Sequence, residues 1–233
     1  MKKIGMLIFA ATLVIGLVVA NIFSFGRTQS RFFNFNMSFG SVKGSGNIAT
    51  INPDISGFNA VRVGGVFQVD ITAQKDFGVE IEGDDNILKY IKVVLRNGTL
   101  SIEADRKLSP TSPIRVRISA PDIEKLDVSG VANVTLNDLK NSELNIDASG
   151  ASKIKINGET ASLIVDVSGA TKIDAENLKA VDANIDASGA SDVVVNVSGD
   201  LKSEASGASK ILYSGSPTNV EKSAHGASRV SPK

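Results

Sequence analysis

The chain has 233 residues, with 25 basic and 25 acidic side chains and no cysteine. Without cysteine it can form no disulfide, no thiolate metal site and no lipid-modified cysteine. Its balanced charge disfavours a nucleic-acid partner, which requires a basic surface. Aromatic residues make up only 5% of the chain and tryptophan is absent, so we expect a thin core of small and β-branched side chains.

The N-terminus has the composition of an export signal. Lys2 and Lys3 precede an uncharged, mostly apolar stretch, residues 4–26, and Val18-Val19-Ala20 is an acceptable cleavage site. As a hydrophobic helix the stretch would reach roughly 34 Å, enough to span a bilayer core. We therefore expect residues 1–26 to be either a cleaved signal peptide or a retained transmembrane anchor. Both place the rest of the chain outside the cytoplasm, in the periplasm, in the outer membrane or at the cell surface.

Residues 27–46 are rich in Phe, Asn, Ser and Gly and show no sustained period, which predicts a linker. Four phenylalanines in it leave two other interpretations open, a cap on the first folded unit or a contact with a membrane surface: Phe32, Phe33, Phe35 and Phe39. The folded domain is expected over residues 47–233.

An irregular β region is predicted from about Asn47 to Pro121. Val63, Val69 and Ile71 alternate with polar residues, which indicates a strand bent at Gly64-Gly65. Further along, a strand from Val79, a short helical turn capped by Asp85 or Asn86 and another strand are expected. Asn97-Gly98 predicts a tight hairpin, and a loop with Pro110 and Pro113 precedes a strand that Pro121 ends.

The second half repeats one motif, SGAS and its variants, at a nearly fixed interval. Successive copies of its glycine are 18 to 20 residues apart: Gly130, Gly150, Gly169, Gly189, Gly207 and Gly226. A degenerate copy earlier in the chain aligns Gly65 with Gly130, Val63 with Val128, Val69 with Val134 and Ile71 with Leu136. Self-similarity at this period is typical of stacked repeats. The sequence thus predicts an all-β fold, a β-solenoid in which two sheets wind as a superhelix with coils of about 19 residues.

One coil shows how the motif is used. Alternation predicts that Leu144, Ile146, Ala148, Gly150, Ser152, Ile154 and Ile156 face inward, whereas Asn145, Asp147, Ser149, Lys153 and Lys155 face outward. The small residues in the middle favour a tight corner between two sheets. A second turn in each coil recurs at Asn137-Asp138, Asn157-Gly158, Glu176-Asn177, Asn196 with Ser198-Gly199, and Ser214-Gly215. Stacking would bring the amides of Asn137, Asn157 and Asn196 together as a ladder.

The run of SGAS corners, the opening VKGSGN, the strand FNAVRVGGVFQVDI and the segment DDNILKYIKVVLRNGTLSI together resemble a bacterial domain family. It is described as "putative auto-transporter adhesin, head GIN domain", and the resemblance covers about Val42 to the C-terminus. It implies a two-sheet β-superhelix turning at Gly-Ser bends and a role in adhesion at the bacterial surface. It also implies likeness to lyase and acyltransferase solenoids without their catalytic residues.

Acidic residues recur at one outward position of the coils: Asp127, Asp147, Asp166, Asp186 and Glu204. Such a column could bind calcium or act as a general acid or base. The position six residues later is basic in four copies, Lys153, Lys172, Lys210 and Arg229, and differs in two, Asn133 and Asp192. We therefore expect the charges on either side of each corner to offset one another, and we assign no metal site.

The single histidine, His225, lies in the last repeat, and the hexapeptide spacing that solenoid acyltransferases use is absent around it. The repeated serines Ser149, Ser168, Ser188 and Ser206 have no base beside them in the sequence, and SGAS lacks the lysine of a phosphate loop. No catalytic, cofactor-binding or metal-binding residue is therefore assigned.

The sequence predicts a non-enzymatic, exported binding module of the cell envelope, an adhesin by resemblance, with a glycan or a surface protein as partner. It would contact a membrane only through residues 4–26, if these are retained. Two alternatives stay open: a polysaccharide-acting solenoid enzyme of the lyase kind, and an envelope scaffold that assembles end to end through uncapped coils.

Overall fold

The structure is a computed structural model that describes residues 40–233. The expected signal or anchor, its hydrophobic helix and the four phenylalanines of the linker lie outside these residues. Residues 40–233 contain no candidate for a membrane-spanning helix.

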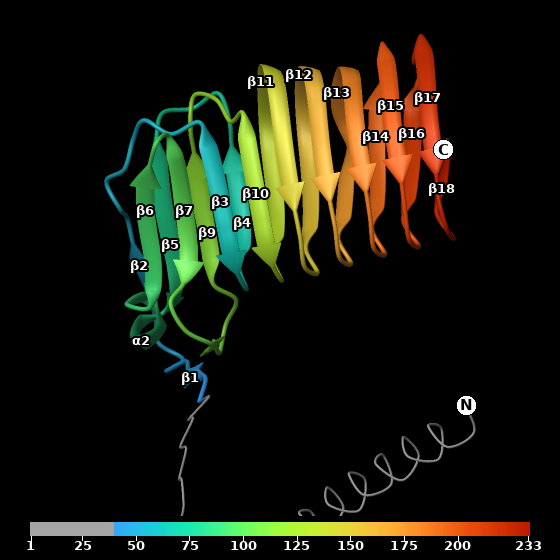
Figure 1. The fold of residues 1–233 in the computed structure, drawn as a ribbon. Helices are drawn as coiled ribbons and strands as arrows, with labels where there is room; N and C mark the ends of the chain where they lie inside the picture. Colours follow the sequence, from blue (N-terminus) through green and yellow to red (C-terminus); the bar gives the residue numbers. More distant parts are fainter. Residues whose placement is uncertain (1–39) are drawn as a thin grey trace, which may run out of the picture. The chain divides into compact units, whose positions relative to one another are not determined.

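The described chain is almost entirely β-structure, wound into a solenoid of about five turns (Figure 1). Its elements are β1 (Val42–Lys43), β2 (Ile48–Ile51), β3 (Ala60–Gly65), β4 (Gln68–Thr72), β5 (Gly78–Asp84), α2 (Asp85–Leu88), β6 (Ile91–Arg96), β7 (Thr99–Ala104), β8 (Leu108–Ser109), β9 (Arg115–Ser119), β10 (Lys125–Gly130), β11 (Asn133–Ala148), β12 (Lys153–Val167), β13 (Lys172–Ala187), β14 (Asp192–Val197), β15 (Asp200–Ala205), β16 (Lys210–Gly215), β17 (Asn219–Ala224) and β18 (Arg229–Pro232). The predicted fold class is confirmed for this part of the chain.

The strands form two faces that meet at the SGAS corners. We call face A the strands that follow each corner and face B the strands that precede it. Face A contains β2, β5, β9, β4, the first halves of β11 to β13, and β14, β16 and β18, whereas face B contains β6, β7, β3, β10, the second halves of β11 to β13, and β15 and β17. Neighbouring strands are parallel throughout the regular coils. At the N-terminal end three pairs are antiparallel: β2 with β5, β5 with β9, and β6 with β7.

At the second corner of the coil, β11, β12 and β13 continue from one face to the other as single strands. The pairing of β11 with β12 shifts register between Leu136 and Leu139, where Asp138 has a φ of 57°. The expected asparagine ladder is present for one pair, since Asn157 Nδ2 donates to Asn137 Oδ1 at 2.7 Å. Asn196 does not join it, because Glu176 and Asn177 intervene, and its amide donates to the carbonyl of Glu176 instead.

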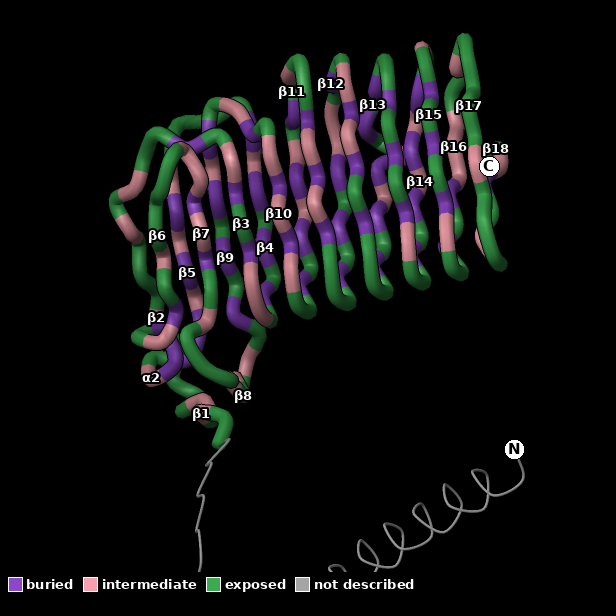
Figure 2. Tube along the Cα trace, viewed as in Figure 1, coloured by how far each residue is buried: buried purple, intermediate pink, exposed green. Residues whose placement is uncertain are grey.

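The core is a stack of aliphatic columns between the two faces, drawn as the buried segments of Figure 2. One column runs through Val61, Leu126, Ile146, Val165 and Ile185, and another through Val69, Val134, Ile154, Ile173, Val193 and Ile211, all buried. Each fully buried side chain of this kind contributes roughly 1.5–3 kcal/mol relative to an exposed one. The alignment of Val63 with Val128, and of Ile71 with Leu136, is confirmed by the strand register.

The prediction that the corner glycines face inward is wrong. Gly150, Gly169 and Gly189 are exposed at the solenoid's edge and have φ values between 77° and 90°. The buried positions next to them are instead occupied by Ala148 and Ser152 and their equivalents. The corner is tight because the next coil lies directly against it: a Cβ on Gly150 would lie 2.4 Å from the carbonyl oxygen of Gly130.

The N-terminal region matches its predicted elements closely. The Asn97-Gly98 hairpin joins β6 to β7, with φ values of 50° and 74°, and the strand before Pro121 is β9. The helical turn is α2, but its N-cap is Asp84 rather than Asp85 or Asn86. Residues 42–43 of the expected linker form β1, which pairs with β8.

Candidate functional site

The acidic column lies on the outer surface of face B. The strand register aligns Asp127 with Asp147, Asp147 with Asp166, Asp166 with Asp186, and Asp186 with Glu204. Like charges directly opposite on neighbouring strands, about 4.8 Å apart, are mutually destabilising. Residues 40–233 contain no group of three or more His, Asp or Glu side chains arranged to hold a metal ion.

The basic column lies on face A, on the other side of the corner. Lys153 aligns with Lys172, Lys172 with Asp192, Asp192 with Lys210, and Lys210 with Arg229. Because the outer surfaces of the two faces point away from each other, the expected offset across each corner is wrong. Two members of the acidic column form ion pairs among the described residues, and both pair within face B: Asp127 with Arg62 and Asp147 with Lys125, each at 2.8 Å.

The serines of the SGAS motif have a structural role. The second serine of the corner is buried in most coils and donates to the backbone of the preceding coil, as Ser209 Oγ does to the carbonyl of Ala187 at 2.9 Å. His225 lies on the exposed last corner, where its Nε2 is 3.0 Å from Ser223 Oγ. Within residues 40–233 the imidazole donates no hydrogen bond to a carboxylate, so the pair lacks the orienting acid of a catalytic triad.

A groove that the sequence did not indicate crosses the N-terminal part of face A. It has a volume of about 570 Å³, and the segment after β2 forms one wall while β4, β5 and β9 form the floor. Its lining includes Asn52, Asp54, Asp70, Thr72, Lys75, Glu80, Arg117 and Ser119. The groove thus presents carboxylates, cations, an amide and hydroxyls on a hydrogen-bonded sheet, an arrangement suited to a polar ligand.

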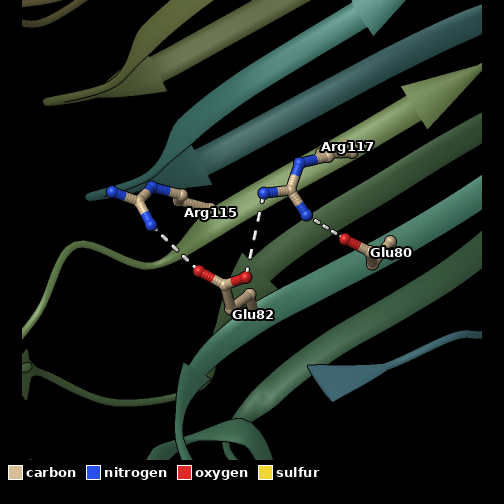
Figure 3. A network of polar contacts seen from close by, with 4 residues as sticks. All are labelled: Glu80, Glu82, Arg115 and Arg117. Carbon is tan, nitrogen blue, oxygen red and sulfur yellow. Dashed lines mark hydrogen bonds and ion pairs between the residues drawn. The ribbon is translucent and has the colours of Figure 1, made fainter. Parts of the chain in front are cut away.

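One side of the groove is held by a network of four charges (Figure 3). Because β5 and β9 pair antiparallel, Glu80 lies opposite Arg117 and Glu82 lies opposite Arg115. Arg115 Nη1 is 3.0 Å from Glu82 Oε1, Arg117 Nη2 is 3.7 Å from Glu82 Oε2, and Arg117 also donates to Glu80. Exposed pairs of this kind contribute at most about 1 kcal/mol each. Their main effect is to orient Glu80 and Arg117 at the groove. In the sequence, the only indication of this network is the alternation of Glu in VEIEG and of Arg in RVRIS.

Asp84, at the end of β5, is a buried carboxylate that fastens two distant segments. Its Oδ1 accepts from the backbone N–H of Gly46 at 2.7 Å, and its Oδ2 accepts from that of Thr111 at 2.9 Å. Burial by itself raises the pKa of Asp84. The backbone hydrogen bonds from Thr111, Gly46 and Ser112 lower the pKa by more than burial raises it, so it lies below its ordinary value of 3.8. This carboxylate therefore binds the β1 and β8 segments to the first coil.

We expect protonation of the Asp84 carboxylate to lower the free energy of unfolding in acid. Because its pKa is lower in the folded than in the unfolded chain, its stabilisation is complete above the ordinary value of 3.8 and is lost as the pH falls below it. Asp84→Asn should therefore reduce the difference in free energy of unfolding between pH 6 and pH 3, measured by urea denaturation followed by circular dichroism. It should also speed amide exchange at Gly46 and Thr111. The matched control is Asp166→Asn on the exposed column, and an equal change in both variants would contradict this role.

The strand topology defines the class of fold, a two-sheet β-solenoid with an antiparallel N-terminal end. The chain belongs to the family described as "putative auto-transporter adhesin, head GIN domain", whose sequence pattern matches residues 57–217.

Three solved structures have the same fold. They are described as putative adhesins, from Bacteroides fragilis (22% identity, TM-score 0.69), Parabacteroides merdae (20%, 0.56) and Parabacteroides distasonis (19%, 0.54). Each similarity covers 83% of this chain and 99% or 100% of the other chain. No curated protein matches the sequence.

Proposed function

We propose that the chain is a non-enzymatic binding module that is exported and attaches the cell envelope or cell surface to a glycan or a protein. The observation that carries the proposal is the polar groove on face A, in a member of a family described as adhesins. Its floor consists of adjacent strands, so its polar side chains are positioned before a ligand arrives. Export is proposed from Lys2, Lys3 and the uncharged residues 4–26.

The groove offers specific groups to a ligand. Asp70 and Lys75 line it, and neither forms an ion pair within residues 40–233. A carboxylate accepts and an ammonium donates hydrogen bonds, as sugar hydroxyls and peptide groups require. Glu80 and Arg117 are already bonded to each other and so contribute shape and orientation.

Carboxylates and cations both line the groove, and a polysaccharide-acting enzyme would need such side chains for catalysis. The groove must therefore be considered for this alternative function as well. Arg117 is bonded to Glu80 and Glu82, so these charged side chains at the groove are engaged with one another. We propose binding without turnover. Incubation with polysaccharides should release no unsaturated or reducing ends, and steady release by the purified chain would support the enzyme instead.

The proposed function is tested by binding of the purified chain to an array of glycans and matrix proteins, together with adhesion of cells that lack the protein. We expect at least one class of ligand to bind, and the deletion to reduce adhesion. Asp70→Asn combined with Lys75→Gln should weaken binding about tenfold, the effect of losing about 1.4 kcal/mol. Asp166→Asn combined with Lys153→Gln is the control away from the groove. Adhesion and array binding both equal to background would refute the proposal.

A further inference from the structure

A second depression lies on the outer surface of face B, on the opposite side of the solenoid from the groove. It has a volume of about 310 Å³ and is lined by Arg62, Lys92, Val94, Arg96, Ser101 and Glu103. These residues come from β3, β7 and β6, the three strands at the N-terminal end of the face. We call this depression the cationic hollow, because three of its six lining residues are basic.

The strand register explains why these side chains meet. Val94 on β6 lies opposite Ser101 on β7, and Ser101 lies opposite Arg62 on β3. Lys92 and Arg96 flank Val94 at two residues on either side, so all three project from the same surface of β6. Ser101 is therefore at the centre of the floor, with long cationic side chains on three sides.

Of the charged side chains that line the cationic hollow, only Arg62 forms an ion pair within residues 40–233. Arg62 Nε is 2.8 Å from Asp127, which holds this guanidinium in place. Within residues 40–233, neither Lys92 nor Arg96 forms an ion pair, and neither does Glu103. With Arg62 offset by Asp127, the side chains of Lys92, Arg96 and Glu103 leave a local net charge of +1, and Lys92 lies opposite Glu103 across the β6–β7 pair.

The surroundings of the cationic hollow are of the opposite sign. Beyond Asp127 the same face carries the aligned carboxylates of Asp147, Asp166, Asp186 and Glu204. A uniformly charged polyanion lying along the solenoid axis would be repelled by this column. Contact is therefore confined to the N-terminal end of the face, where one or two acidic groups can enter.

We propose that the cationic hollow binds the acidic group, a carboxylate or a sulfate ester, of an acidic polysaccharide. Lys92 and Arg96 would pair with the anion, and the Ser101 hydroxyl would donate a hydrogen bond to it. Glu103 would accept from a sugar hydroxyl, and Val94 would contact the apolar surface of the sugar ring. The inference rests on the proposed binding function for the choice of a glycan as ligand, but it concerns a different surface from the groove.

The test measures binding of the full-length purified chain to three immobilised polymers. Hyaluronan carries carboxylates, dextran sulfate carries sulfate esters, and dextran is the neutral control. We expect binding to one or both acidic polymers, none to dextran, and weaker binding as salt rises. Lys92→Gln combined with Arg96→Gln should weaken the binding about tenfold, because both cations that pair with the anion are lost.

A matched variant keeps the outcome interpretable. Lys153→Gln combined with Lys172→Gln removes the same two charges from exposed sites on face A and should leave polyanion binding unchanged. The thermal denaturation midpoints of both variants should stay within a few degrees of the original. Equal binding by the original chain and the Lys92/Arg96 variant, equal weakening by both variants, or no binding of either acidic polymer would overturn the inference.

The two proposals fail in different ways. If array binding and adhesion persist while the Lys92/Arg96 variant behaves as the original chain, the cationic hollow is wrong and the binding function stands. If polyanion binding depends on Lys92 and Arg96 but adhesion is unaffected by deletion, the hollow stands and the adhesive role is wrong.

Discussion

Replacement of Gly150 by alanine should lower the free energy of unfolding by about 3–5 kcal/mol. Gly150 has a φ of 90°, which costs a residue with a Cβ about 1–2 kcal/mol. The added Cβ would also lie 2.4 Å from the carbonyl oxygen of Gly130, so neighbouring coils would have to separate at the corner. The measurement is chemical denaturation followed by circular dichroism, because the chain has no tryptophan.

Gly57→Ala separates the two causes. Gly57 has a similar φ of 83°, but a Cβ there would meet nothing within 4 Å. Its replacement should therefore cost only about 1–2 kcal/mol, the conformational part. A Gly150→Ala variant no less stable than Gly57→Ala would show that contact between coils does not require glycine at the corner.

Leu163→Ala should cost about 2–5 kcal/mol. Leu163 is fully buried on β12 and aligns with Leu144 and Ala183 in the neighbouring coils, so truncation leaves a cavity in the middle of a stacked column. In a solenoid such a defect weakens the contacts with the coils on both sides. Thermal and urea denaturation would both report the loss.

The next residue provides the control. Ile164 aligns with Asn145 and Asn184, on the outer surface of face B, and is partly exposed. Ile164→Ala should cost less than about 1 kcal/mol. Similar losses at Leu163 and Ile164 would mean that the inward and outward positions of this strand have been assigned the wrong way round.

The regular coils were predictable because their requirements are local. A corner needs a residue that accepts a positive φ, and the strands on either side alternate with period two, so the degenerate coil could be aligned at Gly65 although its sequence differs from SGAS. The error at Gly150 also has a local origin. Strict alternation was carried through the corner, where the backbone turns and the side-chain direction is no longer that of a strand.

The groove and the cationic hollow were not predictable, because each depends on pairing between segments far apart in the chain. Nothing near Glu80 indicates that Arg117 will lie opposite it. Nothing near Ser101 indicates that Arg62 will be its neighbour. The offset predicted across the corners failed for a related reason. Spacing along the chain placed each acid near a base, but the fold turns the two positions onto surfaces that face away from each other.

The hydrogen bonds between corners have a consequence for how long such a protein can be. The amides of Ala151, Ala170, Ala190, Ala208 and Ala227 each donate to the glycine carbonyl of the preceding corner. Each coil therefore forms the same hydrogen bond with the coil that follows it as with the coil that precedes it. Duplication of a coil would create no new type of interface. Each added coil extends the rod by about 4.8 Å. The reach of the domain can thus change through gene duplication, while the groove and the cationic hollow at its N-terminal end stay intact.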